Sequence, residues 1–307
     1  ASFGTTIDVL PPYLMDFLSA LSERIDEIAQ IEKVDLCIIR DIDGERYSGF
    51  RFLEEKGYSP AMGFPIARMK LEWNSIEGYL SSLKAKKRHN LLHKRIKMFE
   101  PGISFEIIED YAPYSERLAE LWTNVAKRQN GYEHERLTPA FFETMSKHLK
   151  GRSHVAAIKL NGEIVAYGLN LIGDDEFFGV AEGMDYGVRD NYDLYANNIL
   201  EGLRIACEMG KKTFNIGITA YDFKTAIGAE LESCIYMVKA FKDKNYSAVY
   251  ADLIQNNIKQ PENNHRVFRN SNTLNRKQLN VIKESIKRQD DPLDPFAKHL
   301  RYLRVDT

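Results

Sequence analysis

Apolar residues recur with two different periods along the chain, and this alternation predicts a protein built from both helices and strands. Residues 13–31 carry leucine, phenylalanine and isoleucine at helical spacing, directly after a Pro-Pro pair that can open a helix. The segments 34–42 and 64–72 are apolar or alternate as strands do, and the segment 44–57 ends in a glycine typical of a helix stop. With a short strand at 5–10, the first 72 residues predict strand, helix, strand, helix, strand.

A second series of elements begins at residue 75, where a serine can cap a helix that we expect to run unbroken to residue 100. Thr138-Pro139 indicates a helix start, and Asn161-Gly162 is a strong hairpin signal between two apolar strands. The further elements expected are a strand at 103–110, helices at 113–129 and 138–150, three strands within 153–185, a helix at 191–209, a strand ending at 218, a short helix over "YDFK", and a strand at 233–241.

This order predicts an α/β (α+β) fold, in which a mixed, mostly antiparallel sheet is flanked by helices. We expect residues 153–240 to form one mixed sheet with a splayed centre, and residues 1–72 to repeat the second half of that order as a partial copy. The expected domains are a partial N-terminal half at 1–74, a connecting helix at 75–102, a catalytic domain at 103–243, and a polar extension at 244–307 with a basic helix at 277–289.

Composition narrows the class of protein without naming a chemistry. The net charge is −2, so no global positive field favours bulk nucleic-acid binding. The three cysteines are far apart and fit a reducing compartment, and no apolar run approaches the ~18 residues of a membrane span. The N-terminus has no signal-peptide pattern and no initiator methionine, which is consistent with a processed or truncated start. We therefore expect a cytoplasmic protein without a membrane span.

A run of basic residues lies within the expected long helix. Between Lys84 and Lys97 the chain has no acidic residue, and Lys87, Arg88, Lys94 and Arg95 recur at helical spacing. Such a run is either a solvated helix face or a contact for a phosphate-bearing partner: a tRNA, a carrier protein or a nucleotide-linked substrate. The nearby histidines, His89 and His93, have no third metal ligand, so we assign no metal site.

The stretch "ITAYDFKTAIGAE" places a tyrosine, an aspartate and a lysine at the head of a helix, directly after a buried strand. Sites in α/β proteins collect at such strand ends. Lys224 is either a solvated lysine or a fixed positive charge that stabilises an oxyanion. For Asp222 a role as helix cap is the stronger interpretation, and Tyr221 also fits the core.

Two acids and several aromatic residues are candidates for an acceptor site. Glu182 and Asp185 end the third central strand, where a carboxylate could deprotonate an amine. A loop-facing acid at a strand end explains them equally well. Tyr132, His134, Phe141 and Phe142 are candidates for a pocket wall, although helix core is the better interpretation for the two phenylalanines.

Four stretches resemble the Fem-like branch of the GNAT acyltransferases, the FemAB and BioF2-like proteins. They are "YLSSLKAKKRHNLLHKRIKMFE", "NGYEHERLTPAFFETM", "GEIVAYGLNLIGDDEFFGVAEGMD" and "YDLYANNILEGLRIACEMGKKTFNIGITAYDFKTAIGAE". The resemblance covers roughly 75–240 and is weaker over 1–72. It implies a tandem GNAT-like fold with an incomplete first copy. It also implies that Lys224 contacts the donor or the developing charge from a rim position, where its loss would barely change stability.

One loop departs from the common GNAT pattern. Where those enzymes have Arg/Gln-x-x-Gly-x-Gly/Ala to hold the pyrophosphate of coenzyme A, this chain has Arg189 but then Asn191-Tyr192-Asp193. Fem-like proteins share the departure, and the peptidoglycan-building members use aminoacyl-tRNA as donor. We expect Arg189, Tyr192, Tyr195, Lys87, Arg88, Lys94 and Arg95 to contact the donor.

The leading hypothesis is therefore an acyltransferase or aminoacyltransferase that moves an activated group onto a small-molecule or peptide amine. Its catalytic residues would be Lys224, Tyr221, Asp222 and Glu182, with Tyr132, His134 and Asp185 at the acceptor. No cofactor is expected to bind tightly, because the donor is a co-substrate: a coenzyme A or carrier-protein thioester, or aminoacyl-tRNA. The alternatives are a non-catalytic degenerate GNAT module that binds a carrier protein or RNA through the basic helix, and a nucleic-acid-binding protein that also uses the basic tail.

Overall fold

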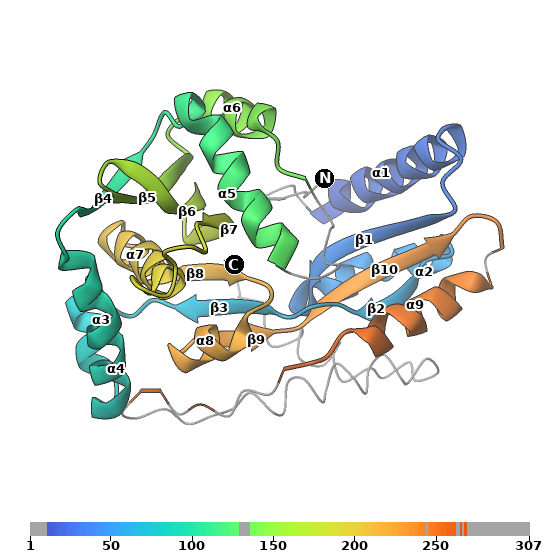
Figure 1. The fold of residues 1–307 in the computed structure, drawn as a ribbon. Helices are drawn as coiled ribbons and strands as arrows, with labels where there is room; N and C mark the ends of the chain where they lie inside the picture. Colours follow the sequence, from blue (N-terminus) through green and yellow to red (C-terminus); the bar gives the residue numbers. More distant parts are fainter. Residues whose placement is uncertain (1–10, 129–135, 244, 262–264, 266, 269–307) are drawn as a thin grey trace. The chain divides into compact units, whose positions relative to one another are not determined.

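The chain divides into two compact units. The computed structural model describes residues 11–128, 136–243, 245–261, 265 and 267–268 (Figure 1). The first unit comprises residues 1–65, 232–260 and 276–307, and the second comprises 66–231 and 261–275. The expected strand at 5–10 and basic helix at 277–289 lie outside the described residues.

The first unit is built on a three-stranded antiparallel sheet in the order β1-β10-β2. All side chains of the central strand β10 are buried, because the strand is paired on both edges and the sheet is covered by helices. A partly buried ion pair of 2.6 Å joins Lys239 on this strand to Asp26 on α1. The elements are α1 (Pro11–Ile31), β1 (Leu36–Asp43), a 3₁₀ helix (Gly44–Phe50), α2 (Phe52–Glu55), β2 (Ser59–Met62), β10 (Cys234–Ala240) and α9 (Tyr246–Asn257).

The second unit contains a seven-stranded sheet in the order β4-β5-β6-β7-β8-β3-β9. Neighbouring strands from β4 to β7 are antiparallel, β7 and β8 are parallel, and β8 and β3 are antiparallel. The strands are β3 (Ile66–Lys70), β4 (Ile103–Ile108), β5 (Ser153–Leu160), β6 (Glu163–Ile172), β7 (Glu176–Met184), β8 (Thr213–Gly217) and β9 (Glu230–Glu232). The sheet is therefore mixed and mostly antiparallel, as the sequence predicts.

Helices cover both faces of this sheet, and the alternation of side chains along β5 shows which helix covers which face. Val155 and Ala157 pack with α5 (Ser115–Arg128) and α6 (Pro139–His148), whereas Ala156 between them packs with α7 (Leu194–Glu208). The α7 face also receives the aromatic residues Phe177 and Phe214, whose rings meet edge to face at 5.4 Å. Successive residues of a strand thus contribute alternately to two separate cores, one under α5 and α6 and the other under α7.

The expected long helix at 75–100 is broken, and this prediction is wrong. It forms α3 (Ile76–Ser82), α4 (Ala85–Arg95) and a 3₁₀ turn (Ile96–Phe99). At the break Leu83 and Lys84 are extended, with ψ of 151° and 143°. A tertiary contact explains the break, because the Lys84 amide donates to the Val267 carbonyl at 3.1 Å and Leu83 forms a β-bridge with Phe268.

The prediction of one sheet over 153–240 is wrong for its last strand. β10 pairs with β1 and β2 in the first unit, whereas β3 from the N-terminal part of the chain pairs with β8 in the second. The units therefore divide the chain at different places from the four expected domain ranges. The roles given to those ranges, and the interpretation of 1–72 as a partial copy, stay predictions. From the sequence, no elements are expected at β2, β9 and α9. The single helix expected at 44–57 is instead a 3₁₀ helix and one short α-helix.

The structure confirms several local features that the sequence predicts. Ser75 caps α3, since its hydroxyl accepts a hydrogen bond of 3.1 Å from the Gly78 amide. Asn161 and Gly162 both have positive φ, 51° and 89°, as a tight hairpin turn requires. Within the described residues, no helix combines the length and the apolar character needed to cross a membrane.

The double phenylalanine of α6 provides a test of the core between the sheet and helices α5 and α6. Phe142 is fully buried and its ring meets those of Tyr167 and Phe141 edge to face at 5.8 and 5.2 Å, whereas Phe141 is only partly buried. We expect Phe142→Ala to lower the free energy of unfolding by about 3–5 kcal/mol, because it leaves a cavity. Phe141→Ala should cost clearly less in the same urea titration. Equal losses would show that both rings contribute equally to the core.

Candidate functional site

The pairing between β7 and β8 stops partway along both strands. The two strands are paired in parallel from Glu176 opposite Thr213 to Phe178 opposite Asn215. Beyond these residues β7 continues to Met184 and β8 continues to Gly217 without further pairing to each other. The sheet is thus splayed at its centre, and side chains beyond Phe178 and Asn215 lie where the ladder no longer joins the two strands.

A strained turn leads from β8 into α8 (Tyr221–Ala226). Thr219 and Ala220 both adopt the left-handed conformation, with φ of 62° and 46°, which costs a non-glycine residue of order 1–3 kcal/mol. The turn starts α8 only three residues after β8 ends. It also brings the Lys224 Nζ within 2.6 Å of the Ile218 carbonyl oxygen, to which it donates a hydrogen bond.

Lys224 is buried, not exposed at a rim. Its side chain is only 5% exposed, and burial lowers its pKa to about 8, although the negative charge of Glu182 acts in the opposite direction. The expectation of a rim position is therefore wrong. The sequence is misleading here because Lys224 stands in a short polar helix, while the strained turn rotates that helix so that Lys224 and Thr225 face inward.

Glu182 lies on β7 beyond the point where the strands separate. It is opposite Gly168 of β6, which itself lies under the side chain of Asn198 from α7, so the carboxylate is on the α7 face of the sheet. Burial raises the pKa of Glu182, while Lys224 and a hydrogen bond from Asn198 oppose that shift. Glu182 and Lys224, predicted separately from the sequence, are thus electrostatic neighbours at the splay.

Two further polar groups belong to this cluster. The Tyr195 hydroxyl and the Asn198 Oδ1 atom are buried, and neither has a hydrogen-bond partner in the described structure. The Tyr195 ring meets that of Phe223, on α8, edge to face at 5.6 Å. Because buried polar groups are nearly always paired, these two atoms beside Glu182 have hydrogen-bonding capacity that a bound polar group can use. We call Glu182, Lys224, Tyr195 and Asn198 the splay cluster.

Asn198 was missed at the level of sequence, although a signal existed. The sequence predicts a helix at 191–209 but no functional residue between Tyr195 and the end of that helix. In the structure α7 is buried along most of its length, yet it includes Asn197, Asn198 and Glu201 among its buried residues. Asparagine and glutamate are rarely buried without a specific partner. Polar residues inside an otherwise apolar central helix are therefore the feature that could have identified Asn198.

The other residues of "YDFK" have different surroundings. Tyr221 is partly buried against the same core as α7, and Asp222 is exposed in the first turn of α8. That position is favourable for an acid because of the helix dipole. A catalytic role for either residue stays a prediction.

The loop after β7 is ordered by its own side chains. Asp185 accepts a hydrogen bond of 2.8 Å from the Gly187 amide and lies 3.8 Å from a guanidinium nitrogen of Arg117. The guanidinium carbons of Arg128 and Arg189 lie 4.5 and 5.2 Å from the centre of the Tyr186 ring. Tyr186 follows Glu182 closely along the chain, and the charge of Glu182 helps burial to raise its pKa. Two cationic side chains thus lie near the splay cluster.

The N-terminal end of α7 is occupied by a carboxylate of the chain itself, that of Asp193. Asp193, which has a left-handed φ of 47°, forms ion pairs of 2.5 Å with Lys94 and 2.7 Å with Lys97. Burial acts to raise the pKa of Asp193, but the hydrogen bonds from these two lysines outweigh it and hold the pKa below its usual value. The first amide of the helix, Leu194 N–H, donates to the Arg189 carbonyl at 3.0 Å. The Leu194 amide, Lys94 and Lys97, which could bind a phosphate at this helix end, therefore already have partners within the protein.

The basic run on α4 divides into two sets. Lys94 and Lys97 bind Asp193, and Arg95 pairs with the buried Glu201 of α7, so these cations hold α4 against α7. Lys87 contacts His265 at 3.5 Å. Two other residues predicted to contact the donor have these surroundings. Arg88 is partly exposed. The backbone carbonyl of Tyr192 accepts a hydrogen bond of 2.9 Å from the Asn197 side chain. Tyr132 and His134 lie outside the described residues, and every donor-binding role stays a prediction.

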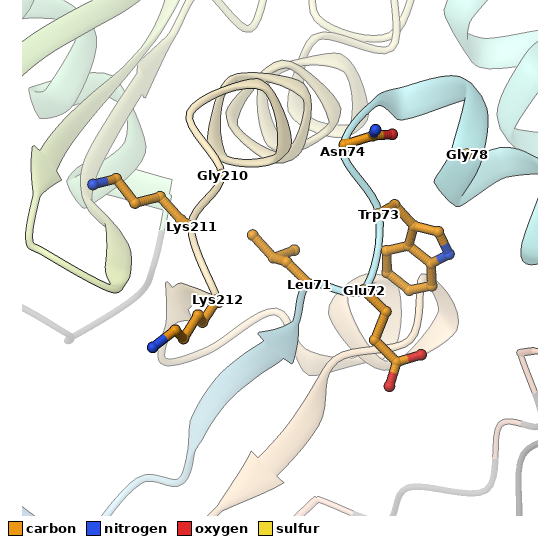
Figure 2. Close-up of a pocket in the computed structure, with 8 residues that line it drawn as sticks. All are labelled: Leu71, Glu72, Trp73, Asn74, Gly78, Gly210, Lys211 and Lys212. Carbon is orange, nitrogen blue, oxygen red and sulfur yellow. The ribbon is translucent and has the colours of Figure 1, made fainter.

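A separate pocket of about 500 Å³ lies at the other end of β8 (Figure 2). This end of β8 is the one at Thr213, its first residue, which is opposite Lys70 of β3. Lys224 instead follows Gly217, the last residue of β8. Lys211 donates to the carbonyls of Gly173 and Asp174, and Lys212 binds Asp175, so both ammonium groups point away from Leu71. None of the predicted site residues lines this pocket, and we do not place the reaction there. Its walls are Leu71, Glu72, Trp73, Asn74, Gly78, Gly210, Lys211 and Lys212.

The two sets of basic residues differ in what their loss should cost. Arg95→Met removes a cation from Glu201, which is 5% exposed and keeps Arg204 as a second partner, so we expect a loss of about 2 kcal/mol in the free energy of unfolding. The matched control Lys86→Met changes an exposed lysine on the same helix and should stay within about 0.5 kcal/mol. Urea unfolding measures both. An Arg95 variant as stable as the control would show that the pair does not hold α4 in place.

The lowered pKa of Lys224 predicts how stability depends on pH. Between about pH 8 and pH 10.5 the folded protein has released the Lys224 proton that the unfolded chain still holds. Raising the pH through that interval therefore favours the folded state. The free energy of unfolding of the wild type should rise relative to that of Lys224→Met, which lacks the titration. Parallel urea midpoints at pH 8 and pH 10 would contradict a buried, depressed lysine.

Comparison with known proteins connects this geometry to a family. A family model described as peptidoglycan biosynthesis/recognition, FemAB-like, matches residues 15–271. The chain is also 31% identical over 249 residues to proteins named putative 8-amino-7-oxononanoate synthase 2 from two strains of Mycobacterium tuberculosis. That match covers 80% of this chain but 32% of each relative, so the chain spans about a third of their length.

The fold of FemX is similar at low sequence identity, and a second solved structure matches with a lower score. FemX is 13% identical with a TM-score of 0.52, and the match covers 76% of this chain and 79% of that one. A GCN5-related N-acetyltransferase from Sphaerobacter thermophilus is 13% identical with a TM-score of 0.43, over 75% of this chain and 70% of the other. The family match covers most of the chain, and on that ground the chain belongs to the FemAB-like family.

Proposed function

We propose that this chain is an acyltransferase or aminoacyltransferase whose reaction takes place at the splay cluster. The observation that carries the proposal is the electrostatic influence of Glu182 and Lys224 on each other beyond the last β7–β8 pair, beside two buried polar groups that lack partners in the described structure. Family membership supports a transferase. A site that holds donor and acceptor together gains rate by orienting them.

The roles follow from the two perturbed groups. Burial raises the pKa of Glu182 and lowers that of Lys224 to about 8, so a base and an ammonium group stand side by side. The acceptor nitrogen attacks the donor carbonyl carbon, and Glu182 takes the proton that the nitrogen loses. The Lys224 ammonium faces the negative charge that develops on the carbonyl oxygen. The C–N bond forms as the C–S or C–O bond to the donor breaks, and the leaving group takes up a proton.

A covalent enzyme intermediate is not needed, and the cysteines are poor candidates for one. Burial and the charge of Glu208 raise the pKa of Cys207 to about 11, so its thiol stays protonated near neutral pH. His154 is buried beside Phe177, and burial lowers its pKa to about 4. Its one side-chain hydrogen-bond contact in the described structure is Asn170 at 3.4 Å. These residues behave as parts of the core.

For the donor we favour a carrier-protein thioester or aminoacyl-tRNA over free coenzyme A. The support is Asp193, which puts a carboxylate at the N-terminus of α7 together with the two lysines that could otherwise meet a pyrophosphate. The acceptor is proposed to be a primary amine. Because Arg128 lies near the cluster, whereas Arg189 is paired with Asp190, an acceptor that also carries one carboxylate or phosphate is favoured. An amino-oxo-carboxylic acid, the compound class in the relatives' name, belongs in the panel.

The test is single-turnover transfer from each donor class to a panel of amines. We expect Lys224→Ala to lower the rate by about 10²-fold or more, and Glu182→Gln by a similar factor. Lys224→Arg should rescue poorly, because a planar fork does not replace a compact charge. Lys212→Ala, at the other end of β8, is the matched control and should keep the wild-type rate.

Two outcomes would contradict the proposal. A Lys224→Ala protein with the full rate would remove the lysine from the mechanism. No turnover with any donor, combined with binding of a carrier protein or RNA, would favour the non-catalytic module instead. Melting temperatures of all variants separate loss of chemistry from loss of fold, which matters because Lys224 is buried.

A further inference from the structure

The outer side of α4 and its 3₁₀ continuation presents apolar side chains to solvent. Leu92, Ile96 and Phe99 are 46%, 64% and 80% exposed. Their spacing of four and three residues places them in one row along the helix. Leu91 and the ion-paired Lys94 and Arg95 hold the opposite side against the second unit's core and α7. Large apolar side chains with this exposure in a continuous row mark an interaction surface.

The same side also carries positive charge. Arg88 lies one turn before Leu92 in the same row, and Lys86 is exposed near it. The chain from Lys84 to Lys97 contains no acidic residue. The cations on the inner side are neutralised by Asp193 and Glu201, whereas in the described part of the chain Lys86 and Arg88 have no acidic partner. We call Lys86, Arg88, Leu92, Ile96 and Phe99 the α4 ridge.

The helix α9 provides a contrast within the same chain. Its exposed residues Tyr246, Val249, Tyr250 and Leu253 form a similar row, with exposures of 53%, 51%, 41% and 52%. However, α9 contains no lysine or arginine and contains Asp252. An apolar row therefore occurs on both α4 and α9, and of these two helices only α4 combines it with cations that have no acidic partner in the described residues. The partner of the α4 ridge should therefore offer both an apolar region and negative charge.

We propose that the α4 ridge docks the protein peripherally onto an anionic lipid surface. Basic residues beside a row of leucine, isoleucine and phenylalanine are the pattern of helices that lie in a bilayer interface. The cations would meet headgroup phosphates, while Ile96 and Phe99 enter the acyl boundary. A single-stranded or folded RNA would gain little from Leu92 and Ile96. A protein partner would need a groove shaped for three protruding side chains, whereas a fluid lipid surface adapts to them.

The experiment measures binding of the purified chain to extruded vesicles by flotation. One set of vesicles is an equimolar mixture of phosphatidylglycerol and phosphatidylcholine, and the other is phosphatidylcholine alone. We expect binding to the anionic vesicles that weakens as salt is raised, and much weaker binding to the neutral ones. The double variant Ile96→Ser/Phe99→Ser should weaken binding by about tenfold or more, since two apolar side chains no longer leave water. Lys86→Glu should weaken binding to the anionic vesicles only.

The matched control is Tyr250→Ser/Leu253→Ser on α9, which removes two exposed apolar side chains that lack neighbouring cations on their helix. It should bind as the wild type does. All of these residues are exposed, so melting temperatures and transfer to a soluble amine should stay unchanged. A wild type that floats with neither vesicle overturns the proposal, and so does an equal loss in the α9 control. Retention by RNA or by an acidic protein without vesicle binding would assign the ridge to that partner instead.

Discussion

The separation of β7 from β8 is the constraint on which the candidate site depends. Paired strands leave no room between them for a substrate, because their backbones are about 5 Å apart. Here pairing ends at Phe178 and Asn215, and each strand then supplies one member of the charged pair. β7 carries Glu182 directly, whereas β8 delivers Lys224 through a turn with two left-handed non-glycine residues. The energy stored in that turn is offset by the packing of α8, and it fixes where the lysine points.

The central helix α7 joins two different electrostatic regions of the second unit. On one side Asn198 and Tyr195 stand beside Glu182 and Lys224, where burial moves both pKa values toward neutrality. At its N-terminus, and on the side of Glu201, it is charged and forms ion pairs with α4 and the 3₁₀ turn that follows α4. A helix that serves both regions has to be polar at specific positions and still buried. This explains why it tolerates asparagine and glutamate in a core of leucine and isoleucine.

Much of the fold could be predicted because its signals are local. Turn chemistry at Asn161-Gly162, the cap at Ser75 and the apolar runs of β5 to β7 depend on neighbouring residues alone. The break at Leu83 could not be predicted, because its cause is a contact with Phe268 far along the chain. The splay cluster was half predicted for the same reason. Glu182 and Lys224 each follow a recognisable strand, but their proximity, the burial of Lys224 and the part of Asn198 depend on tertiary packing.

The exchange of strands in the topology has a consequence for how the chain is made. The first unit's sheet needs β10 between β1 and β2, and β10 follows β1 by nearly the whole length of the second unit. During synthesis the N-terminal strands therefore leave the ribosome without the strand that joins them, while the residues of the second unit's sheet all emerge before β10. Loop closure over that distance is slow and exposes unpaired edges. The sheet of the second unit can thus form first, whereas the sheet of the first unit can form only after β10 has been synthesised.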